Sequence, residues 1–207
     1  MRNVFLAGVA FGALTTSAMA ADMAPYYKAP PVAQGFNWNG FYLGADVGGA
    51  WSSVDANGFG ASSSASGVIG GVYGGYNWQV APQWLIGIEG DSSWTDLSGT
   101  IGFGKVNWLG SVRGRIGYTP TATMLFYFTG GAAWSTIDNS GIGSFAGSTD
   151  QTKSGWVIGG GVEWAPWPSN WLIRAEYLNY NFTGVAVGPF STDLTINEVR
   201  AGVAYKL

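Results

Sequence analysis

The 207-residue sequence contains no cysteine and no histidine. Without cysteine there is neither a disulfide framework nor a thiolate metal site, and without histidine the commonest metal ligand and general base are missing. Charge is also scarce, because only 10% of the residues are charged, against about 25% in an average soluble domain. That is too little charge for an ordinary water-facing surface. The net charge of −3 provides no basic footprint for nucleic acid, and we expect neither a nucleic-acid partner nor a cofactor.

Long apolar runs are also missing, apart from one at the N-terminus. Arg2 precedes an apolar stretch over residues 4–14, and the small residues "SAMA" follow at 17–20. This order is typical of a secretory signal peptide, predicted over residues 1–20, so the mature chain would begin at Ala21 and Asp22. No other stretch reaches the 18 or more apolar residues of a membrane helix. The prediction is an exported protein that does not cross a membrane with helices.

A proline-rich segment follows the predicted cleavage site. Residues 21–36 include Pro25, Pro30 and Pro31, which favour an extended, polyproline-like conformation. We expect a periplasmic tether here. Whether this tether does more than provide reach stays open at this level.

The remainder of the chain is rich in glycine and tryptophan, with 34 and 11 residues respectively, and it alternates with the period of β-strands. The alternation predicts eight strands, over residues 37–51, 67–80, 84–94, 105–118, 124–134, 155–165, 171–180 and 193–207. Three connections are short and contain proline, whereas the other four are longer and rich in Ser, Gly, Asn and Asp. Short turns on one rim and long loops on the other are typical of outer-membrane barrels. The predicted fold is therefore all-β, an eight-stranded antiparallel transmembrane β-barrel over residues 37–207.

The two faces of each predicted strand differ in polarity. In the strand over residues 105–118, Val112 and Ile116 lie on one face, while Arg113 and Arg115 lie on the other. After the signal peptide, every arginine falls on a polar face. An arginine facing lipid at the membrane midplane costs about 2 to 4 kcal/mol, so the apolar faces should contact lipid. A soluble lipocalin-type barrel would need the reverse arrangement and would leave aromatic faces in water.

Tryptophans recur near the ends of the predicted strands. From Trp84 to Trp94, ten steps along the strand at about 3.3 Å each and a tilt near 40° span roughly 25 Å, the height of the apolar band of an outer-membrane barrel. The stretch "FNWNGFYLGADVGGAW" at residues 36–51 follows the same plan, with tryptophan near both ends. The predicted aromatic belts consist of Trp38, Trp51, Trp78, Trp84, Trp94, Trp108, Trp134, Trp156, Trp164 and Trp171.

Charged residues of both signs occupy the predicted inward positions. An eight-stranded barrel has an interior just wide enough for side chains to fill, so these charges should form a network of salt bridges and hydrogen bonds. Its predicted members are Asp46, Glu89, Asp91, Arg113, Arg115, Glu163, Arg174, Glu176, Glu198 and Arg200. A catalytic dyad of Glu89 and Asp91 is the alternative, but two acids two positions apart beside several arginines are typical of a packed interior. The sequence "GIGSFAG" at residues 141–147 has the wrong spacing for a phosphate-binding loop. We predict no catalytic residue and no metal site.

Several segments together resemble a known family. "FNWNGFYLGADVGGAW", "YNWQVAPQWLIGIEGD", "VNWLGSVRGRIGYTP" and the C-terminal "EVRAGVAYKL" are similar to the small outer-membrane β-barrel proteins of alphaproteobacteria, the RopB-like major surface proteins of the porin family. The resemblance implies an abundant surface protein of the Gram-negative cell envelope. It also implies a C-terminal signal for the barrel-assembly machinery at Val203, Tyr205 and Leu207, where leucine replaces the usual terminal aromatic residue. Relatives linked to peptidoglycan imply a possible attachment point at Ala21 and Asp22.

The sequence leaves three hypotheses for function. The first is a non-enzymatic structural protein of the outer membrane that supports the envelope and presents surface loops. The second is a narrow porin-like channel for small solutes, and the third is an adhesin or haemin receptor that works through its loops. The expected partners are outer-membrane lipid, lipopolysaccharide, the barrel-assembly machinery and possibly peptidoglycan. The oligomeric state and the ligand of the loops stay open.

Overall fold

The computed structural model describes residues 36–55, 62–99, 105–138, 151–166, 168–187 and 190–207. Eight β-strands account for most of them. The strands are β1 (Gly40–Asp55), β2 (Ser62–Ala81), β3 (Trp84–Gly99), β4 (Lys105–Thr121), β5 (Met124–Asp138), β6 (Gln151–Trp164), β7 (Trp171–Val187) and β8 (Phe190–Lys206). The predicted signal peptide, nearly all of the predicted tether and the possible attachment point at Ala21 and Asp22 lie outside the described residues. None of the described residues belongs to a helix that is long and apolar enough to cross a membrane.

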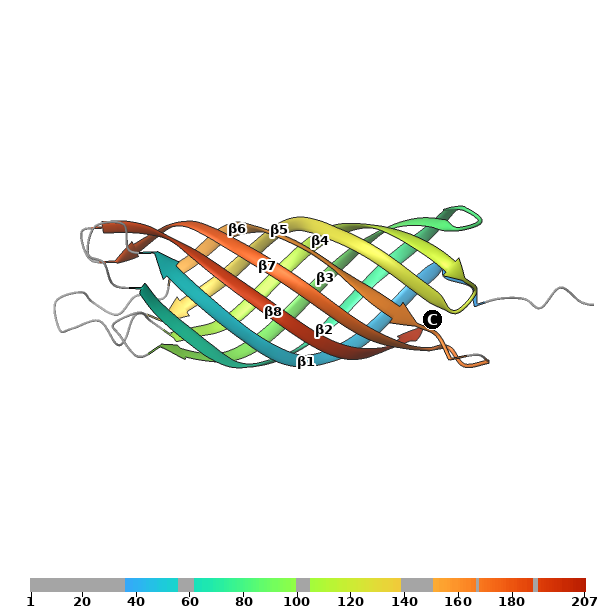
Figure 1. The fold of residues 1–207 in the computed structure, drawn as a ribbon, viewed down its shortest axis with the longest axis horizontal. Helices are drawn as coiled ribbons and strands as arrows, with labels where there is room; N and C mark the ends of the chain where they lie inside the picture. Colours follow the sequence, from blue (N-terminus) through green and yellow to red (C-terminus); the bar gives the residue numbers. More distant parts are fainter. Residues whose placement is uncertain (1–35, 56–61, 100–104, 139–150, 167, 188–189) are drawn as a thin grey trace, which may run out of the picture. The chain divides into compact units, whose positions relative to one another are not determined.

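The strands form one closed antiparallel barrel in the order β1 to β8 (Figure 1). The barrel closes where β1 pairs with β8, for example with Leu43 opposite Tyr205. Short turns join β2 to β3, β4 to β5 and β6 to β7. They lie at the end of the barrel where β1 begins and β8 ends, which we term the turn end. The predicted eight-stranded antiparallel barrel is confirmed.

The strand boundaries differ from the prediction in two ways. Most strands extend several residues further at the end opposite the turns, because pairing continues beyond the tryptophans that marked the predicted ends. The first strand begins at Gly40 and not at residue 37. Gly40 has a φ of 125°, a backbone conformation that favours glycine. The residues before it therefore leave the line of β1.

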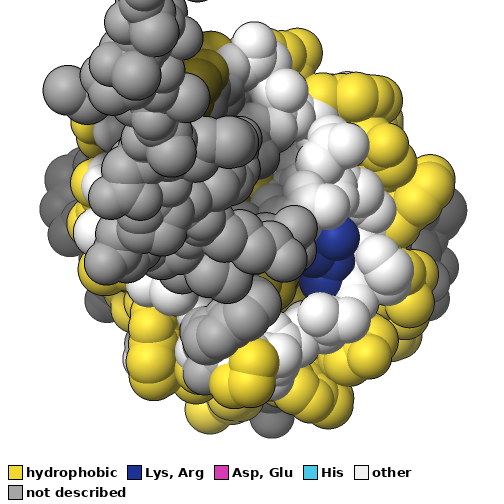
Figure 2. Space-filling view, turned by 90° about the vertical axis from the view of Figure 1, so that its right-hand side faces the viewer, with side chains coloured by type: hydrophobic (Ala, Val, Ile, Leu, Met, Phe, Trp, Pro, Cys, Tyr) yellow, Lys and Arg dark blue, Asp and Glu magenta, His cyan; other side chains and the backbone are white. Residues whose placement is uncertain are grey.

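Exposure alternates along each strand. On β4, Val112 and Ile116 are about half exposed, whereas Arg113 and Arg115 between them are buried. A shift of one residue in the register would exchange the two sets. A view onto the turn end shows hydrophobic side chains around the circumference, and a basic side chain among backbone and other side chains nearer the centre, where the described residues are visible (Figure 2). The apolar surface faces outward and the charges face inward.

Candidate functional site: the barrel interior

The barrel interior holds all ten of the charged residues that were predicted to face it. Each side chain belongs to a residue with an exposed fraction of 9% or less. They come from six strands: Asp46 on β1, Glu89 and Asp91 on β3, Arg113 and Arg115 on β4, Glu163 on β6, Arg174 and Glu176 on β7, and Glu198 and Arg200 on β8. Three acid–arginine pairs lie directly opposite each other on neighbouring strands: Glu89 with Arg113, Glu163 with Arg174, and Glu176 with Arg200. The register of the sheet therefore positions these three acid–arginine contacts directly, and the other ion pairs depend on how the side chains extend across the interior.

Glu89 is the acceptor on which most of the arginines converge. Its carboxylate accepts hydrogen bonds from Arg113 Nη2 at 2.6 Å, Arg174 Nη1 at 3.0 Å and Arg115 Nη1 at 3.3 Å. Glu163 then binds two of the same arginines, at 2.8 Å from Arg115 Nη1 and 2.6 Å from Arg174 Nη2. Charge-assisted hydrogen bonds are among the strongest in proteins. These contacts cross the barrel and tie β3, β4, β6 and β7 together.

A second group of contacts extends the network toward β8. Glu176 binds Arg200 Nη2 at 2.7 Å and Arg113 Nη1 at 3.2 Å. Asp91 lies 3.0 Å from Arg113 Nη2 and accepts a hydrogen bond from the Ser111 hydroxyl. Because Arg113 contacts acids from both groups, the two groups of contacts form one connected network.

Tyrosines complete this network, and the sequence did not identify them as partners. Tyr42 donates its hydroxyl to Glu89 Oε2 at 2.6 Å, and Tyr127 donates to Glu176 Oε1 at 2.9 Å. The guanidinium of Arg174 lies 3.9 Å from the ring centroid of Tyr73, a cation–π contact. Tyrosine at an inward position beside an acid or an arginine is the signal that could have found them. Within the described residues, no group of three or more Asp, Glu, His or Cys is arranged to hold a metal ion.

Each interior arginine lies opposite a glycine on one neighbouring strand. The pairs are Arg113 with Gly131, Arg115 with Gly87, Arg174 with Gly202, and Arg200 with Gly48. A Cβ atom on Gly48 would lie 2.7 Å from Arg200 Cα and 2.2 Å from the Val199 carbonyl oxygen. The glycine at position 48 therefore allows the backbones of β1 and β8 to approach each other closely beside Arg200.

We predict opposite outcomes for alanine at two adjacent glycines of β1. Gly48→Ala should lower the free energy of unfolding by about 1 to 3 kcal/mol, because the added methyl group overpacks the interior. Gly49→Ala should change it by less than about 0.5 kcal/mol, because a Cβ atom there has no other atom within 4 Å. Urea unfolding of both variants in lipid vesicles measures the difference. Equal effects at the two positions would contradict this account of the interior.

The acids outnumber the arginines in this network. Six carboxylates (Asp46, Glu89, Asp91, Glu163, Glu176, Glu198) face four guanidinium groups, which leaves a formal charge of 4 − 6 = −2. Glu198 is fully buried, and neither of its oxygens accepts a hydrogen bond from a described residue. Its neighbours across the sheet are Ala50 and Leu178, both members of an apolar cluster. A buried carboxylate in such surroundings is costly.

Replacing Glu198 by leucine should therefore stabilise the barrel. We expect Glu198→Leu to raise the free energy of unfolding by about 1 to 3 kcal/mol, since it removes an unsatisfied buried polar group and extends the apolar cluster. The matched variant Glu176→Leu should lower stability, because it removes a carboxylate that binds both Arg113 and Arg200. The measurement is the urea midpoint of each variant in vesicles. A loss of stability in Glu198→Leu as large as that in Glu176→Leu would disprove the reading of Glu198 as unpaired.

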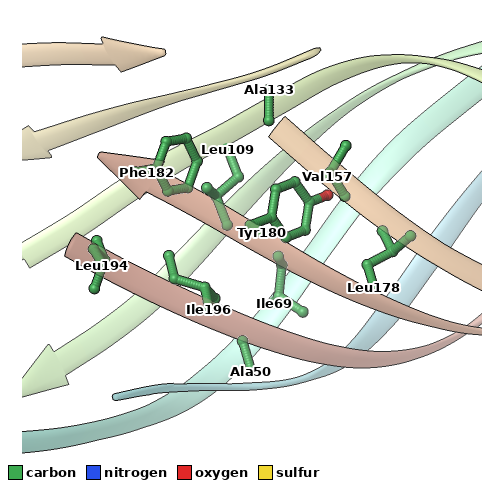
Figure 3. Close-up of a cluster of buried hydrophobic side chains, with 10 residues drawn as sticks. All are labelled: Ala50, Ile69, Leu109, Ala133, Val157, Leu178, Tyr180, Phe182, Leu194 and Ile196. Atoms are coloured by element: carbon green, nitrogen blue, oxygen red, sulfur yellow. The ribbon is translucent and has the colours of Figure 1, made fainter. Parts of the chain in front are cut away.

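Apolar side chains close the interior on both sides of the charges. Toward the end opposite the turns lies a buried cluster of Ala50, Ile69, Leu109, Ala133, Val157, Leu178, Tyr180, Phe182, Leu194 and Ile196 (Figure 3). Toward the turn end lies a second cluster of Phe36, Trp38, Tyr42, Tyr73, Leu85, Leu125, Tyr127, Ala165, Leu172 and Ala204. The sequence predicted the charged part of the interior but not these two apolar layers. Over the described residues, buried side chains therefore occupy the interior in three layers, a charged one between two apolar ones.

The predicted aromatic belts require one correction. Eight of the ten tryptophans are exposed on the outer surface: Trp51, Trp78, Trp84, Trp94, Trp134, Trp156, Trp164 and Trp171. Trp108 is half-buried, with its indole N–H donating to Ser92 Oγ at 2.9 Å. The prediction for Trp38 was wrong, because its exposed fraction is 2% and it belongs to the interior cluster at the turn end. Its position alternates with those of Phe41 and Leu43 and matches those of the inward Tyr42 and Asp46.

The residues of the predicted assembly signal lie on the outer face of β8 and just beyond it. Val203, Tyr205 and Leu207 have exposed fractions of 50%, 41% and 75%. Their side chains alternate with inward-facing positions. The three residues are therefore accessible from outside the barrel.

A closed antiparallel barrel with an apolar outer surface, tryptophans toward both ends and charges inside is a barrel of the outer-membrane type. Residues 7–206 match the model of the outer membrane protein beta-barrel domain, and the chain belongs to this family. It is 33% identical to the 31 kDa outer-membrane immunogenic protein of Brucella melitensis over the full length of both chains. It is 32% identical to the 22 kDa outer membrane protein of Rhizobium leguminosarum bv. viciae, over 85% of this chain and 81% of that protein. The protein is located in the outer membrane.

Solved structures share the fold at low sequence identity. Neisserial surface protein A matches with a TM-score of 0.53 and 19% identity, over 81% of this chain and 97% of that one. The attachment invasion locus protein Ail of Yersinia pestis matches with a TM-score of 0.51 and 16% identity, over 81% of this chain and 99% of that one. These likenesses concern the architecture of the barrel.

Proposed function

We propose that this chain is a non-enzymatic structural protein of the outer membrane that stabilises the envelope and presents loops to the outside. The filled interior carries the proposal. A charged layer connected through Glu89 and Arg113 lies between two apolar clusters, and the interior of an eight-stranded barrel is just wide enough for side chains to fill. The acids Glu89 and Asp91 are occupied by arginines and buried, which supports a packing role for them over catalysis.

Two measurements test the structural role against the narrow channel. In planar bilayers, the pure protein should give no stable current steps, and reproducible single-channel steps would favour the channel. In a strain that lacks the protein, sensitivity to detergent should rise, and the plasmid-borne chain should restore resistance. A chain with shortened segments at residues 56–61, 100–104 and 139–150 should restore it as well. Failure of the loop-shortened chain, when it is folded and present at equal level, would argue against a role carried by the barrel.

A loop-mediated surface function is the second candidate. One solved structure with this fold is named an attachment invasion locus protein, and one homologue is named an outer-membrane immunogenic protein; both names support contact with host molecules. Haemin contact would depend on tyrosine or other aromatic side chains, because the chain has no histidine. Shortened loops that abolish cell attachment or haemin binding, while the barrel stays folded, would favour this candidate.

The proposed partners follow from the outer surface. Exposed apolar side chains such as Phe41, Leu43 and Ile88 fit the acyl chains of outer-membrane lipid and lipopolysaccharide. The outward positions of Val203, Tyr205 and Leu207 fit recognition by the barrel-assembly machinery. Peptidoglycan attachment at Ala21 and Asp22 is also proposed, and the intact mass of the mature protein, with and without digestion of the cell wall, tests it.

A further inference from the structure

The chain ahead of β1 does not continue that strand. At Gly40, which has a φ of 125°, the backbone turns, and the four preceding residues leave the wall of the barrel. Phe36 and Trp38 are buried, whereas Asn37 and Asn39 are exposed. This alternation shows that one side of the segment packs against the barrel. We call residues 36–39 the strap.

One contact of the strap lies on the side of the barrel opposite β1. Trp38 donates its indole N–H to the carbonyl oxygen of Ala122 at 3.3 Å, and Ala122 lies in the turn between β4 and β5. In the closed order of strands, β5 is four strands away from β1 in either direction. The ring of Phe36 packs edge-on against Trp38, with 4.8 Å between the ring centroids. The strap therefore reaches across the turn end of the barrel.

The strap is also fixed on its near side. The Asn39 side chain accepts a hydrogen bond from the backbone N–H of Gln79 on β2 at 3.2 Å. Asn37 in turn accepts one from the backbone N–H of Asn39 at 3.0 Å. Under the strap lie apolar interior residues, among them Leu125 and Leu172. The strap is therefore held by hydrogen bonds on two sides of the rim and by apolar packing beneath it. It is part of the folded barrel.

The position of these contacts determines how force would enter the barrel. A strand pulled outward from its end separates from its neighbours one rung at a time, so each ladder bond in turn bears the whole force. The ladder of β1 with β2 begins at Gly40, directly after the strap. A pull on the N-terminal segment must first extract Phe36 and Trp38 from their seat and break the bond to Ala122.

We infer that the strap fastens the N-terminal segment to the rim opposite β1 and shields the β1 ladder from force applied to that segment. This inference rests on the proposed structural role, because a protein that stabilises the envelope must withstand pulling from its periplasmic side. Gly40 is the residue at which the backbone changes direction between the strap and the β1 ladder. A side chain at this position would be strained, whatever space it had.

Single-molecule force spectroscopy of the full mature chain in a lipid bilayer tests the strap, with the pull applied at the N-terminus. The wild type should show a distinct rupture before the first hairpin unfolds. Trp38→Ala should lose this early rupture, and Trp38→Phe, which keeps a ring but loses the N–H, should show it at reduced force. Trp164→Ala removes an exposed tryptophan outside the strap and should behave as the wild type. Heat-modifiable migration on gels establishes that each variant is folded.

Two outcomes would overturn the inference. One is a wild-type trace that begins with unfolding of the first hairpin, and the other is an early rupture that survives in Trp38→Ala. Either result leaves the envelope assay of the deletion strain unaffected, so failure of the strap and failure of the proposed function are distinguishable. If Trp38→Ala does not fold, Trp38→Phe and Phe36→Leu decide the question by the force of the early rupture.

Discussion

Glu89→Gln is expected to destabilise the barrel by about 3 to 5 kcal/mol, the cost of removing one partner from a buried charged network. The substitution preserves the volume of the side chain but removes the charge to which Arg113, Arg115 and Arg174 donate. Three guanidinium groups would then share fewer acceptors in an interior that excludes water. The Tyr42 hydroxyl would also lose its charged partner.

Asp46→Asn is the matched control. It also removes one buried carboxylate charge, but Asp46 lies 3.5 Å from Arg200, and its oxygens accept no hydrogen bond from the described side chains or backbone. Its effect should stay below about 1 kcal/mol, because asparagine keeps the volume of the side chain and no hydrogen bond to the carboxylate is lost. Urea unfolding in vesicles, followed by tryptophan fluorescence and by migration of unboiled protein, measures both variants. Similar losses of stability in the two variants would contradict the assignment of Glu89 as the main acceptor of the network.

The sequence was sufficient to predict the number of strands, their faces and the inward charges. The reason is physical, because an arginine on the lipid face is costly and strand alternation has a period of two. Once Arg113 and Arg115 are assigned to the interior, the face of every other residue of β4 follows. The same reasoning applies to Arg174 on β7 and Arg200 on β8. The alternation of faces along a strand depends only on neighbouring residues, so it can be derived from sequence.

The contacts across the barrel could not be predicted in the same way. Parity places Tyr73 and Tyr127 inside, but the residues that they meet depend on the stagger of strands far apart in sequence. The two apolar layers and the unpaired Glu198 have the same origin. Trp38 shows a further limit. Its alternation with Tyr42 and Asp46 matches the inward face of β1, but its place near the strand end led to its assignment to a belt.

Ile88→Arg is expected to lower the free energy of unfolding by about 2 to 4 kcal/mol, the cost of a lipid-facing arginine at the membrane midplane. Ile88 is 50% exposed on the outer face of β3, near the middle of the stretch between Trp84 and Trp94. Its neighbours across the sheet are Tyr76 on β2 and Gly114 on β4. Neither supplies a carboxylate, so the guanidinium group would have only lipid around it.

Val80→Arg should cost only about 0 to 1 kcal/mol, because charge is tolerated near the membrane interface. Val80 is 59% exposed and lies beyond the belt residue Trp78, toward the turn between β2 and β3. Both side chains are on the outer face. The difference between the two stability losses therefore reports the effect of depth in the membrane, separately from the effect of introducing an arginine. In a barrel surrounded by water, both substitutions would fall within about 0.5 kcal/mol of the wild type, as surface substitutions usually do. A large cost at Ile88 together with a small one at Val80 is the result that only a lipid-surrounded wall produces, and urea unfolding in vesicles measures both.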